Sequence, residues 1–469
     1  MPFAATGGLG DVMGSLPAAI KAKEKNNVDV RVVLPLYGMV NDEWRAQMKD
    51  EAVFNVSLSW RNIYCGVKSL VKDGVTYYFI DNEYYFKRGA LYGFFDDGER
   101  YAYFCKAVLE MLIQLDFYPD VIHANDWQSA LTVVYLNTKY RYVEGFANTK
   151  SVFTIHNIEY QGKYDFSILG DVFDMGPEYY ALMRYDDCIN LMKAAIECAD
   201  MVSTVSERYA EEIKTPEYSH GLYHVLYRNA QKLTGILNGI DYSYYNPSKD
   251  SVLAKNYDRR NFVSGKAENK MALQREYGLP ERADVPMLAI ISRLATHKGL
   301  DLVKAVADSV VSRNDVQFVI LGKGEEQYES FFSELEARYP DKVKTLLTYN
   351  RDLSKKIYAA CDIFVMPSKS EPCGLSQMIA SRYGAVPVVR ETGGLADSIK
   401  GYWVDNGEIK GNGFTFANYS AEELEDRIGA AIELYADKAQ NKKFVSKVMG
   451  TDFSWTVSAE RYMEMFNSL

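Results

Sequence analysis

The feature that most constrains this chain is a series of five short apolar runs in its second half, at residues 286–291, 316–321, 343–347, 363–366 and 385–389. Each run is followed by a polar loop, and helical spacing recurs between the runs. Short apolar runs that alternate with helices are typical of buried parallel strands. The second half is therefore predicted to be a doubly wound α/β domain.

The loop after the fourth run carries a carboxylate, Glu371, between a buried strand and a helix that starts near Gly374. Ligands of open α/β sheets bind at the carboxyl ends of the strands, and the first amides of a helix attract anions. The amides of Gly374, Leu375 and Ser376 therefore predict an anion site beside a carboxylate, which suits a phosphorylated sugar. A capped turn with a solvated glutamate is the alternative interpretation of this loop.

Two further loops of the second half add cations and glycines. Arg293 and Lys298 lie five residues apart after the first apolar run, and Gly393 and Gly394 follow the fifth. Two cations and exposed amides can hold a diphosphate and stabilise it as it leaves. A nucleotide sugar is therefore the expected ligand class, and a solvated loop is the alternative for the two cations.

The first half is predicted to be a second α/β unit. Its expected strands are at 28–34, 53–60, 66–72, 75–80, 149–155 and 201–206, with another within 119–128 and a last strand and turn at 235–241. Asp126 and His156 each follow a predicted parallel strand, and Asn238 lies in the last turn. Such groups at one sheet edge suit sugar hydroxyls, although a single histidine after a strand is more often structural. The aromatic loop at 81–97 is interpreted as a packed surface loop or as a platform for a polysaccharide.

The N-terminal stretch is a glycine loop that runs into a helix, and no predicted strand feeds it. A doubly wound sheet normally feeds such a loop from a strand. We therefore expect either a free loop or a domain without its first strand. Gly8 and Asp11 lie in this stretch, where paired glycines let the backbone approach a ligand closely.

Charge and cysteine usage exclude several classes of protein. The 53 basic and 63 acidic residues give a net charge of −10, which disfavours nucleic acid and anionic membranes as partners. No apolar run is long enough to span a bilayer, and no secretory signal is recognised. The six scattered cysteines form no Cys-x-x-Cys pair, so neither a zinc site nor a disulfide framework is indicated. We expect a cytoplasmic protein.

Seven motifs, taken together and in order, resemble those of bacterial glycogen synthases and starch synthases, which are retaining glycosyltransferases with the GT-B fold. They are TGGLGD at 6–11, HANDW at 123–127, TIHNIEYQG at 154–162, ILNGID at 236–241, SRLATHKG at 292–299, EPCGLSQ at 371–377 and TGGLAD at 392–397. The resemblance covers nearly the whole chain.

The resemblance implies transfer of glucose from ADP-glucose to the non-reducing end of an α-1,4-glucan, with retention and without a metal or another cofactor. It implies that Arg293 and Lys298 bind the diphosphate and that Glu371 lies beside the donor sugar. The incoming hydroxyl would attack from the side of the leaving group, with the phosphate as base, so no protein nucleophile is assigned. His156 and Asp126 complete the implied catalytic set. The other implied contacts are Gly8, Asp11, Asn238, Tyr349, Cys373, Gly374, Leu375, Ser376, Gly393 and Gly394.

One departure from the family concerns the N-terminus. The first family motif begins Lys-x-Gly-Gly-Leu, and the lysine position is Ala5 here. The strand that precedes this loop in the family is not recognised either. We interpret both as a truncated or altered N-terminus, and we expect weaker catalysis and a less stable first domain.

Three functions are therefore compared. An active glucosyltransferase is favoured, because Arg293, Lys298 and Glu371 are all present. A weakly active or inactive member that binds glucan or nucleotide is the alternative that Ala5 suggests. A glucan phosphorylase would have the same two-domain architecture, but no pyridoxal-lysine signature resembling that family's is seen.

The expected fold class is α/β, with two Rossmann-like doubly wound domains facing a central cleft. The predicted glucan-binding domain spans 1–242, and the predicted nucleotide-sugar domain spans 243–452, with the connection at about 243–283. The last helix, 453–469, is expected to cross back to the first domain. The expected partners are ADP-glucose and a glycogen or starch primer, without nucleic acid or membrane.

Overall fold

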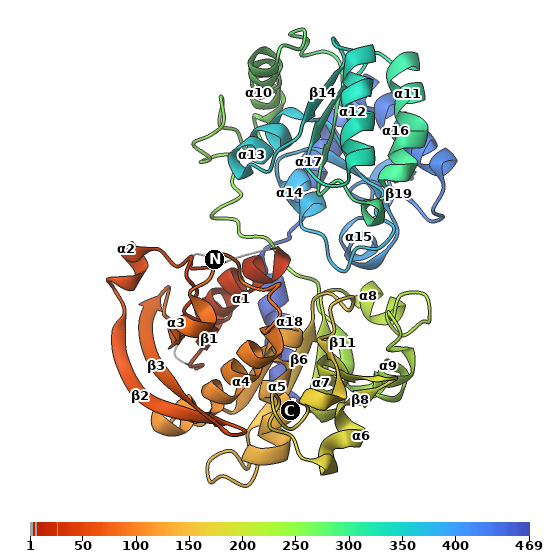
Figure 1. Cartoon of the computed structure of the whole chain (residues 1–469). Coiled ribbons are helices and arrows are strands. Elements are labelled where there is room, and N and C mark those ends of the chain that lie inside the picture. Colours follow the sequence, from red (N-terminus) through yellow and green to blue (C-terminus); the bar gives the residue numbers. More distant parts are fainter. Residues whose placement is uncertain (1–2, 5–6, 26) are drawn as a thin grey trace. The chain divides into compact units, whose positions relative to one another are not determined.

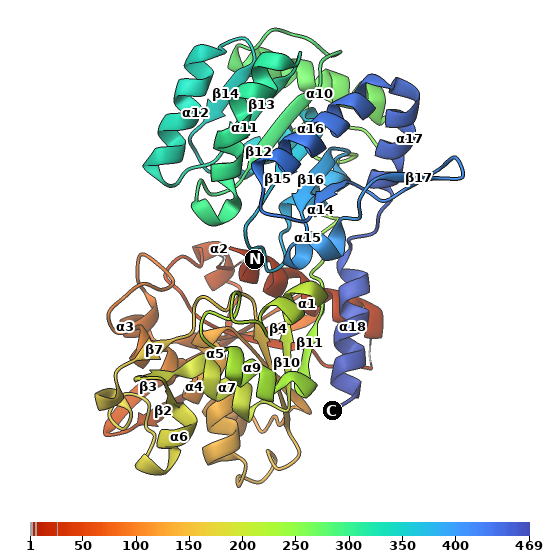
Figure 2. The same ribbon diagram turned by 90° about the vertical axis from the view of Figure 1, so that its right-hand side faces the viewer.

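The computed structural model of the chain describes residues 3–4, 7–25 and 27–469. It divides into two compact units (Figures 1 and 2). Unit 1 comprises Met1–Ile236 and Trp455–Leu469, and unit 2 comprises Leu237–Ser454. Ala5, on which the expectation of weaker catalysis rests, lies outside the described residues. That expectation therefore stays a prediction.

Unit 2 is built on a six-stranded parallel sheet with the order β14-β13-β12-β15-β16-β19. The five predicted strands are confirmed to within about one residue at each end. A sixth strand, β19, was not predicted, because three residues give too short an apolar pattern. The strands are β12 (Met287–Ile291), β13 (Gln317–Leu321), β14 (Val343–Leu346), β15 (Ile363–Met366), β16 (Val386–Arg390) and β19 (Phe414–Phe416).

The strand order of unit 2 reverses direction between β12 and β15. From β12 the chain adds β13 and β14 on one side, and then β15, β16 and β19 on the other. Open α/β sheets bind ligands at such a switch point, outside the carboxyl ends of the strands. The helices of this unit are α10 (Phe262–Tyr277), α11 (Leu300–Arg313), α12 (Glu326–Arg338), α13 (Arg351–Ala360), α14 (Ser376–Arg382), α15 (Gly393–Ser398), α16 (Ala421–Ala436) and α17 (Lys438–Met449).

Unit 1 contains a parallel sheet with the order β11-β10-β6-β5. Its strands are β5 (Val121–Asn125), β6 (Lys150–Ile155), β10 (Met201–Thr204) and β11 (Leu233–Gly235). The last strand of this half, expected with its turn at 235–241, is β11 and begins two residues earlier; its pairing ends where Ile236 N donates to Thr204 O at 2.9 Å. Helix α5 (Trp127–Tyr135) continues as one π turn, Leu136–Tyr140.

A second sheet of unit 1 has the order β1-β4-β3-β2. The strands predicted at 53–60, 66–72 and 75–80 correspond to β2 (Lys49–Leu58), β3 (Arg61–Lys72) and β4 (Val75–Asp81), which pair antiparallel, whereas β1 (Arg31–Pro35) runs parallel to β4. The one doubly wound sheet expected for this half is instead two four-stranded sheets, beside a small antiparallel sheet with the order β7-β9-β8, formed by β7 (Lys163–Tyr164), β9 (Cys188–Asn190) and β8 (Arg184–Tyr185). Among the described residues, no strand joins the edge strands β1 and β5.

The aromatic loop that follows β4 is packed, as the first of its two interpretations expects. Its short helix α3 (Glu83–Phe86) buries Tyr85 and Phe86 in unit 1. Arg88 closes the loop by donating to both carboxylate oxygens of Asp96, at 2.7 and 2.6 Å. Tyr84, Tyr92 and Phe95 remain exposed, so the second interpretation, a platform for a polysaccharide, stays a prediction.

The last helix, α18 (Trp455–Asn467), packs against the first helix, α1 (Gly8–Glu24), within unit 1 (Figure 1). Leu16 of α1 shares a buried cluster with Trp455 and Tyr462. Lys23 and Glu460 form an ion pair at 2.9 Å on the outside. The two ends of the chain thus stabilise the same core. None of the described helices combines the length and apolarity needed to cross a membrane.

We expect Trp455→Ala to destabilise unit 1 by about 3 to 5 kcal/mol, because it removes a large side chain that is only 6% exposed. Val457→Ala, on the exposed side of the same helix, is the matched control and should change stability by less than about 0.5 kcal/mol. Urea unfolding with hydrogen exchange of the α1 amides measures both. Equal effects of the two substitutions would contradict this packing.

Candidate active site

The predicted donor residues of unit 2 meet at the switch point of its sheet. Lys298 lies in the loop after β12, and Glu371 lies in the loop after β15. Lys298 Nζ donates to Glu371 Oε2 at 2.7 Å, and Ser368 Oγ donates to the same oxygen at 3.0 Å. Glu371 is only 7% exposed, so the ammonium compensates a carboxylate that is largely withdrawn from water. The structure thus brings together two residues that are 73 positions apart in sequence.

Three glycines allow the loops at this edge to touch. A Cβ atom on Gly299 would lie 2.0 Å from Pro367 O. On Gly393 it would lie 2.0 Å from Glu371 O, and on Gly394 2.1 Å from Cys373 O. Each distance is far below van der Waals contact, so any other residue would push the loops apart. The backbone packing of these loops therefore fixes the separation between Lys298 and Glu371.

Gly393 and Gly394 begin α15 at the carboxyl end of β16. The Gly394 amide donates to Glu371 O at 3.1 Å and to Pro372 O at 3.2 Å. These hydrogen bonds therefore hold the main chain of the Glu371 loop against the start of α15. The predicted contact of the two glycines with a ligand stays a prediction.

Arg293 is exposed at the mouth of the β12 loop, and its Nη2 lies 3.5 Å from His297 Nε2. Glu325, at the end of the β13 loop, holds this segment in place. Its carboxylate accepts from Thr296 N at 2.8 Å and from Thr296 Oγ1 at 3.0 Å. The loop that carries Arg293 and Lys298 is thus fastened to its neighbours on both sides.

The start of α14 lies directly after Glu371. Gly374 has a φ of 71°, which favours glycine, and α14 begins at Ser376. The first amides of this helix have no intrahelical carbonyl within reach. Gln377 Nε2 donates to Gly374 O at 2.9 Å and to Cys373 O at 3.2 Å, which pins the turn.

Asn238, grouped with the first half in the sequence analysis, belongs to unit 2 and lies beside Cys373. Burial raises the pKa of the Cys373 thiol to about 12, so the thiol stays protonated. Asn238 is 6% exposed, and its Oδ1 has no hydrogen-bond partner among the described residues. A buried acceptor without a donor is costly, so this atom suits a ligand that brings one.

Tyr349 follows β14, two strands away from β12. Its side chain is 82% exposed, and Arg351 Nε donates to its hydroxyl at 3.3 Å. The open ring face leaves room for a planar group to stack, which is what the prediction for this residue requires.

In unit 1, Asp126 and His156 meet at the carboxyl ends of β5 and β6. Asp126 Oδ1 accepts from the His156 amide at 2.8 Å. Burial raises the pKa of Asp126 to about 7, although the amides of His156 and Asn157 oppose this rise. Asp126 also has a φ of 56°, an uncommon conformation for a non-glycine residue. Strained backbone of this kind often marks a functional position.

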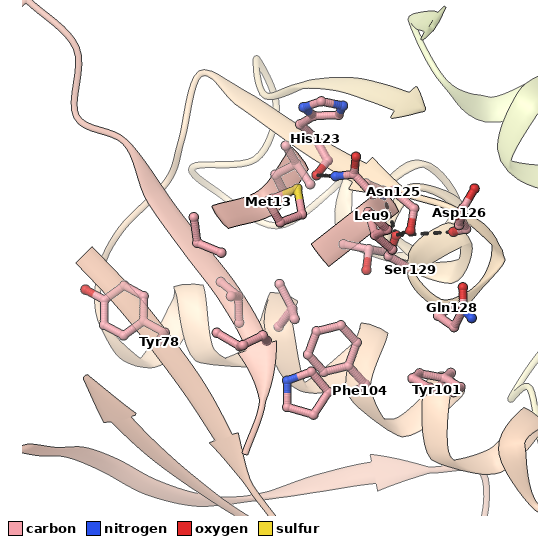
Figure 3. A pocket seen from close by; sticks show the side chains of 18 of the residues that line it. Leu9, Met13, Tyr78, Tyr101, Phe104, His123, Asn125, Asp126, Gln128 and Ser129 are labelled. Atoms are coloured by element: carbon pink, nitrogen blue, oxygen red, sulfur yellow. Dashed lines mark hydrogen bonds between the residues drawn. The ribbon is translucent and has the colours of Figure 1, made fainter. Parts of the chain in front are cut away.

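The imidazole of His156 is neutral at physiological pH, because burial lowers its pKa to about 4. Asn125 Nδ2 donates to His123 O at 3.3 Å (Figure 3), so its Oδ1 faces His156 Nε2 at 2.9 Å. Since Oδ1 can only accept, Nε2 carries the proton and Nδ1 keeps a free lone pair. His156 can therefore accept a hydrogen bond from a hydroxyl.

Gly8 and Asp11 lie in the first turns of α1. A Cβ atom on Gly8 would meet no atom within 4 Å, so packing among the described residues does not require glycine there. Open space at this position is compatible with the predicted approach of a ligand to the backbone.

Within the described residues, no group of three or more His, Cys, Asp or Glu side chains is arranged to hold a metal ion.

Comparison with known proteins assigns both units to glycosyltransferase families. Residues 1–228 match the family model described as starch synthase catalytic domain, and residues 276–447 match glycosyl transferases group 1. A glycogen synthase of Clostridium botulinum (strain Eklund 17B / Type B) is 46% identical over 471 aligned residues, which cover 100% of this chain and 97% of that protein. A glycogen synthase of Anoxybacillus flavithermus is 44% identical, with 100% and 96% covered.

The chain belongs to the glycogen synthase family. A solved structure, the catalytic domain of starch synthase IV from Arabidopsis thaliana bound to ADP and acarbose, matches with a TM-score of 0.88 and 34% identity, covering 100% of this chain and 97% of that one. The α/β fold of the GT-B type expected from the sequence is thereby confirmed, and so is the classification as a glycosyltransferase.

Three supporting residues of this glycogen synthase family member were not singled out from the sequence. They are Ser368, which bonds Glu371, Glu325, which holds Thr296, and Gln377, which pins the α14 turn. Each lies in a motif or strand exit that the sequence analysis located. The partner of each residue, however, can be identified only when the positions of the neighbouring strands in the sheet are known.

We expect Gly299→Ala to be far more damaging than Gly278→Ala. Both glycines have a φ of 74°, so both substitutions carry the same left-handed penalty of about 1 to 2 kcal/mol. Only the new methyl group at 299 collides with Pro367 O, since a Cβ at 278 meets nothing within 4 Å. Transferase activity should fall at least about tenfold in Gly299→Ala alone.

Loss of activity in both variants, or in neither, would contradict the role of the Gly299–Pro367 contact. Thermal unfolding of the two variants separates local displacement of the loop from global loss of the folded state.

The pH dependence of stability follows from the shifted groups of unit 1. The pKa of His156 is lowered to about 4, below the unfolded value of about 6.5. Its contribution to stability is therefore complete above about pH 6.5 and is lost as the pH falls through about 4. His123, whose pKa burial lowers to about 3, acts in the same direction. Asp126 acts oppositely, because its pKa is raised and its contribution is lost as the pH rises through about 7.

We expect His156→Gln to flatten the acid side of the stability curve between about pH 6.5 and 4, relative to the unsubstituted chain. His123 and Asp126 remain in both proteins, so the difference isolates His156. The exposed His224→Gln is the control. Urea unfolding at several pH values measures the slopes, and an unchanged slope in His156→Gln would contradict the burial argument.

Proposed function

We propose that this chain transfers glucose from ADP-glucose to the non-reducing end of an α-1,4-glucan, with retention of configuration. The observation that carries the proposal is the Lys298–Glu371 contact at the switch point of unit 2. Relatives named glycogen synthase, at 44–46% identity over the whole chain, support the reaction. A solved relative bound to ADP and acarbose supports the two substrate classes, a nucleotide and a glucan-like sugar.

In this proposal unit 2 binds the nucleotide diphosphate. Lys298 and Arg293 supply positive charge beside the departing ADP, where negative charge develops. Preorganised charge of this kind is worth about 3 kcal/mol for each well-placed donor. The early amides of α14 bind the distal phosphate, and the exposed ring of Tyr349 stacks on the base. Asn238 Oδ1, which has no donor among the described residues, accepts from the bound ligand.

Glu371 is assigned a positioning role beside the donor sugar and not that of a nucleophile. Its Oε2 already accepts from Lys298 and Ser368, which orients the carboxylate and lowers its nucleophilicity. The remaining oxygen can accept from a sugar hydroxyl. The phosphate of the leaving group then serves as the base for the incoming glucan hydroxyl, on the same face of the sugar.

Unit 1 supplies groups for sugar hydroxyls. The neutral His156 accepts through Nδ1, and Asp126 accepts or donates according to its protonation near pH 7. These short-range hydrogen bonds discriminate a sugar by its hydroxyl pattern.

The complete proposed set comprises five catalytic residues and ten binding residues. The catalytic residues are Glu371, Arg293, Lys298, His156 and Asp126, and the binding residues are Gly8, Asp11, Asn238, Tyr349, Cys373, Gly374, Leu375, Ser376, Gly393 and Gly394. We propose no resident cofactor or metal. We place the reaction in the cytoplasm, where the six unpaired cysteines suit a reducing environment.

The test is incorporation of radiolabelled glucose from ADP-glucose into precipitated glycogen. We expect Lys298→Ala to lower the rate by about a hundredfold or more, because it removes a cation from the diphosphate and leaves Glu371 unpaired. Lys304→Ala, an exposed lysine on α11, is the matched control and should keep its activity.

ADP binding by calorimetry separates the remaining possibilities. Folded protein that binds ADP or glucan but incorporates no label would favour the alternative of a catalytically weak binding member. Full activity of Lys298→Ala would contradict the assignment of the diphosphate site.

A further inference from the structure

Unit 2 contains a buried lysine, Lys266, that lies outside the proposed donor site. It belongs to α10, which packs against α13 (Figure 1), and it is 6% exposed. Its Nζ donates to Tyr358 O at 3.3 Å, to Ala359 O at 3.0 Å and to Tyr383 O at 3.0 Å. An ammonium group has three donors, so three main-chain carbonyls occupy all of them.

The three carbonyls come from the ends of two helices. Two belong to the last turn of α13, and the third, Tyr383 O, belongs to the residue that follows α14. Carbonyls at these positions lack an intrahelical donor. Asp362 N would continue the ladder of α13 by donating to Tyr358 O, but it donates to Met287 O at 2.8 Å instead. Lys266 therefore supplies the donors that both helix ends lack.

A tyrosine hydroxyl reinforces the contact at the end of α14. Tyr257 is 1% exposed, and its hydroxyl donates to Tyr383 O at 2.7 Å. Gly265 makes room for this side chain, because a Cβ atom on Gly265 would lie 2.4 Å from Tyr257 Cβ. Since Gly265 directly precedes Lys266, the phenol and the ammonium reach the same carbonyl oxygen from adjacent places on α10.

The charge of Lys266 is compensated by these helix ends. Among the described residues, no carboxylate forms an ion pair with Lys266, and Asp362 pairs with Lys270 at 2.6 Å. The C-terminal end of a helix carries a partial negative charge that stabilises a cation, and here two such ends meet one ammonium. Burial lowers the pKa of Lys266 to about 8, so the amine is mostly protonated at pH 7.

The opposite ends of α13 and α14 carry segments of the proposed donor site. Tyr349 lies just ahead of α13, and the loop with Glu371 and Gly374 leads into α14. The two helices have ten and seven residues, which correspond to about 15 and 10 Å of helix. Lys266 therefore holds both helices at the ends that lie away from those segments.

Tyr358 connects the two helices along their length. Its carbonyl accepts from Lys266, and its phenol lies beside the side chain of Ser376, the first residue of α14. The ring is 3% exposed and lies 5.4 Å from that of Phe364 in β15. Because the ring is packed, a displacement of the Tyr358 main chain would press on the start of α14.

We propose that Lys266 is a positioning residue for nucleotide binding. Its ammonium, together with the Tyr257 hydroxyl, fixes the C-terminal ends of α13 and α14 and thereby the places of Tyr349 and of the loop 371–374. The inference rests on the proposed function, because these segments are its donor-binding groups. If Lys266 contributed to stability alone, its removal would leave the nucleotide affinity of the folded protein unchanged.

The test is Lys266→Met, which keeps an unbranched apolar side chain and removes the ammonium. We expect the Kd for ADP and the KM for ADP-glucose to rise about fivefold or more, with kcat within about threefold of its original value. The reason is that α13 and α14 shift, whereas the contact of Lys298 with Glu371 is held by the glycines of its own loops. Calorimetry with ADP and initial rates with ADP-glucose measure the two effects.

Lys232→Met is the matched control. Lys232 Nζ donates to Glu197 O at 3.0 Å and to Ala199 O at 2.7 Å, at the end of α7 (Leu191–Cys198) in unit 1. This substitution also takes an ammonium from the carbonyls of a helix end, but the helix leads to no segment of the proposed donor site. We expect it to lower the midpoint of thermal unfolding and to leave the Kd for ADP unchanged.

Tyr257→Phe is the second variant, since it keeps the packed ring and removes one donor from Tyr383 O. We expect it to raise the Kd for ADP about twofold or more, and it decides the question if Lys266→Met does not fold. The proposal is overturned if folded Lys266→Met binds ADP as tightly as the unsubstituted chain, or if Lys232→Met weakens binding equally. With Lys266→Met unfolded, unchanged affinity of Tyr257→Phe overturns it. Failure of the unsubstituted chain to bind ADP would instead contradict the proposed function.

Discussion

The closeness of the loops that follow β12, β15 and β16 is the constraint on which the proposed donor site of unit 2 depends. Gly299, Gly393 and Gly394 let main-chain atoms of neighbouring loops approach where no Cβ atom would fit. The loops therefore behave as one rigid layer, and Lys298 reaches Glu371 at 2.7 Å without any contribution from a ligand. Such preorganisation is what electrostatic stabilisation of a departing diphosphate requires, because reorientation of charges during the reaction would cost free energy.

The two units present different chemistry at the carboxyl ends of their parallel strands. Unit 2 offers full positive charges and helix amides, which suit phosphate. Unit 1 offers buried hydrogen-bonding groups, and the pKa values of His156 and Asp126 show how burial opposes charge there. A hydrogen-bonded chain of neutral groups runs from His123 through Thr154 to Ser203 across three strands. The groups proposed for phosphate and those proposed for sugar hydroxyls therefore differ in electrostatics as well as in sequence position.

Sequence patterns predicted the sheet of unit 2 well, because each buried strand is a short apolar run with a polar exit. They also placed Lys298, Glu371, Asp126 and His156 at strand exits, where the structure has them and where α/β sheets commonly bind ligands. The patterns failed where structure depends on distant partners. The three residues of β19 become a strand only because β16 lies beside them, and Ser368 and Glu325 acquire roles only through loops that other strands bring close. The expectation of one sheet in the first half failed for the same reason. Neither the sequence of β1 nor that of β5 shows that the two strands are edges of separate sheets.

The measurement that tests the account most directly is an experimental structure of this chain with ADP bound. The account predicts a diphosphate oxygen within about 3 Å of Lys298 Nζ, with Arg293 on the same diphosphate and the base against Tyr349. Glu371 should keep its place beside Ser368. ADP bound away from the β12 and β15 loops, or bound there with Lys298 turned away from the phosphates, would contradict the assignment of the donor site.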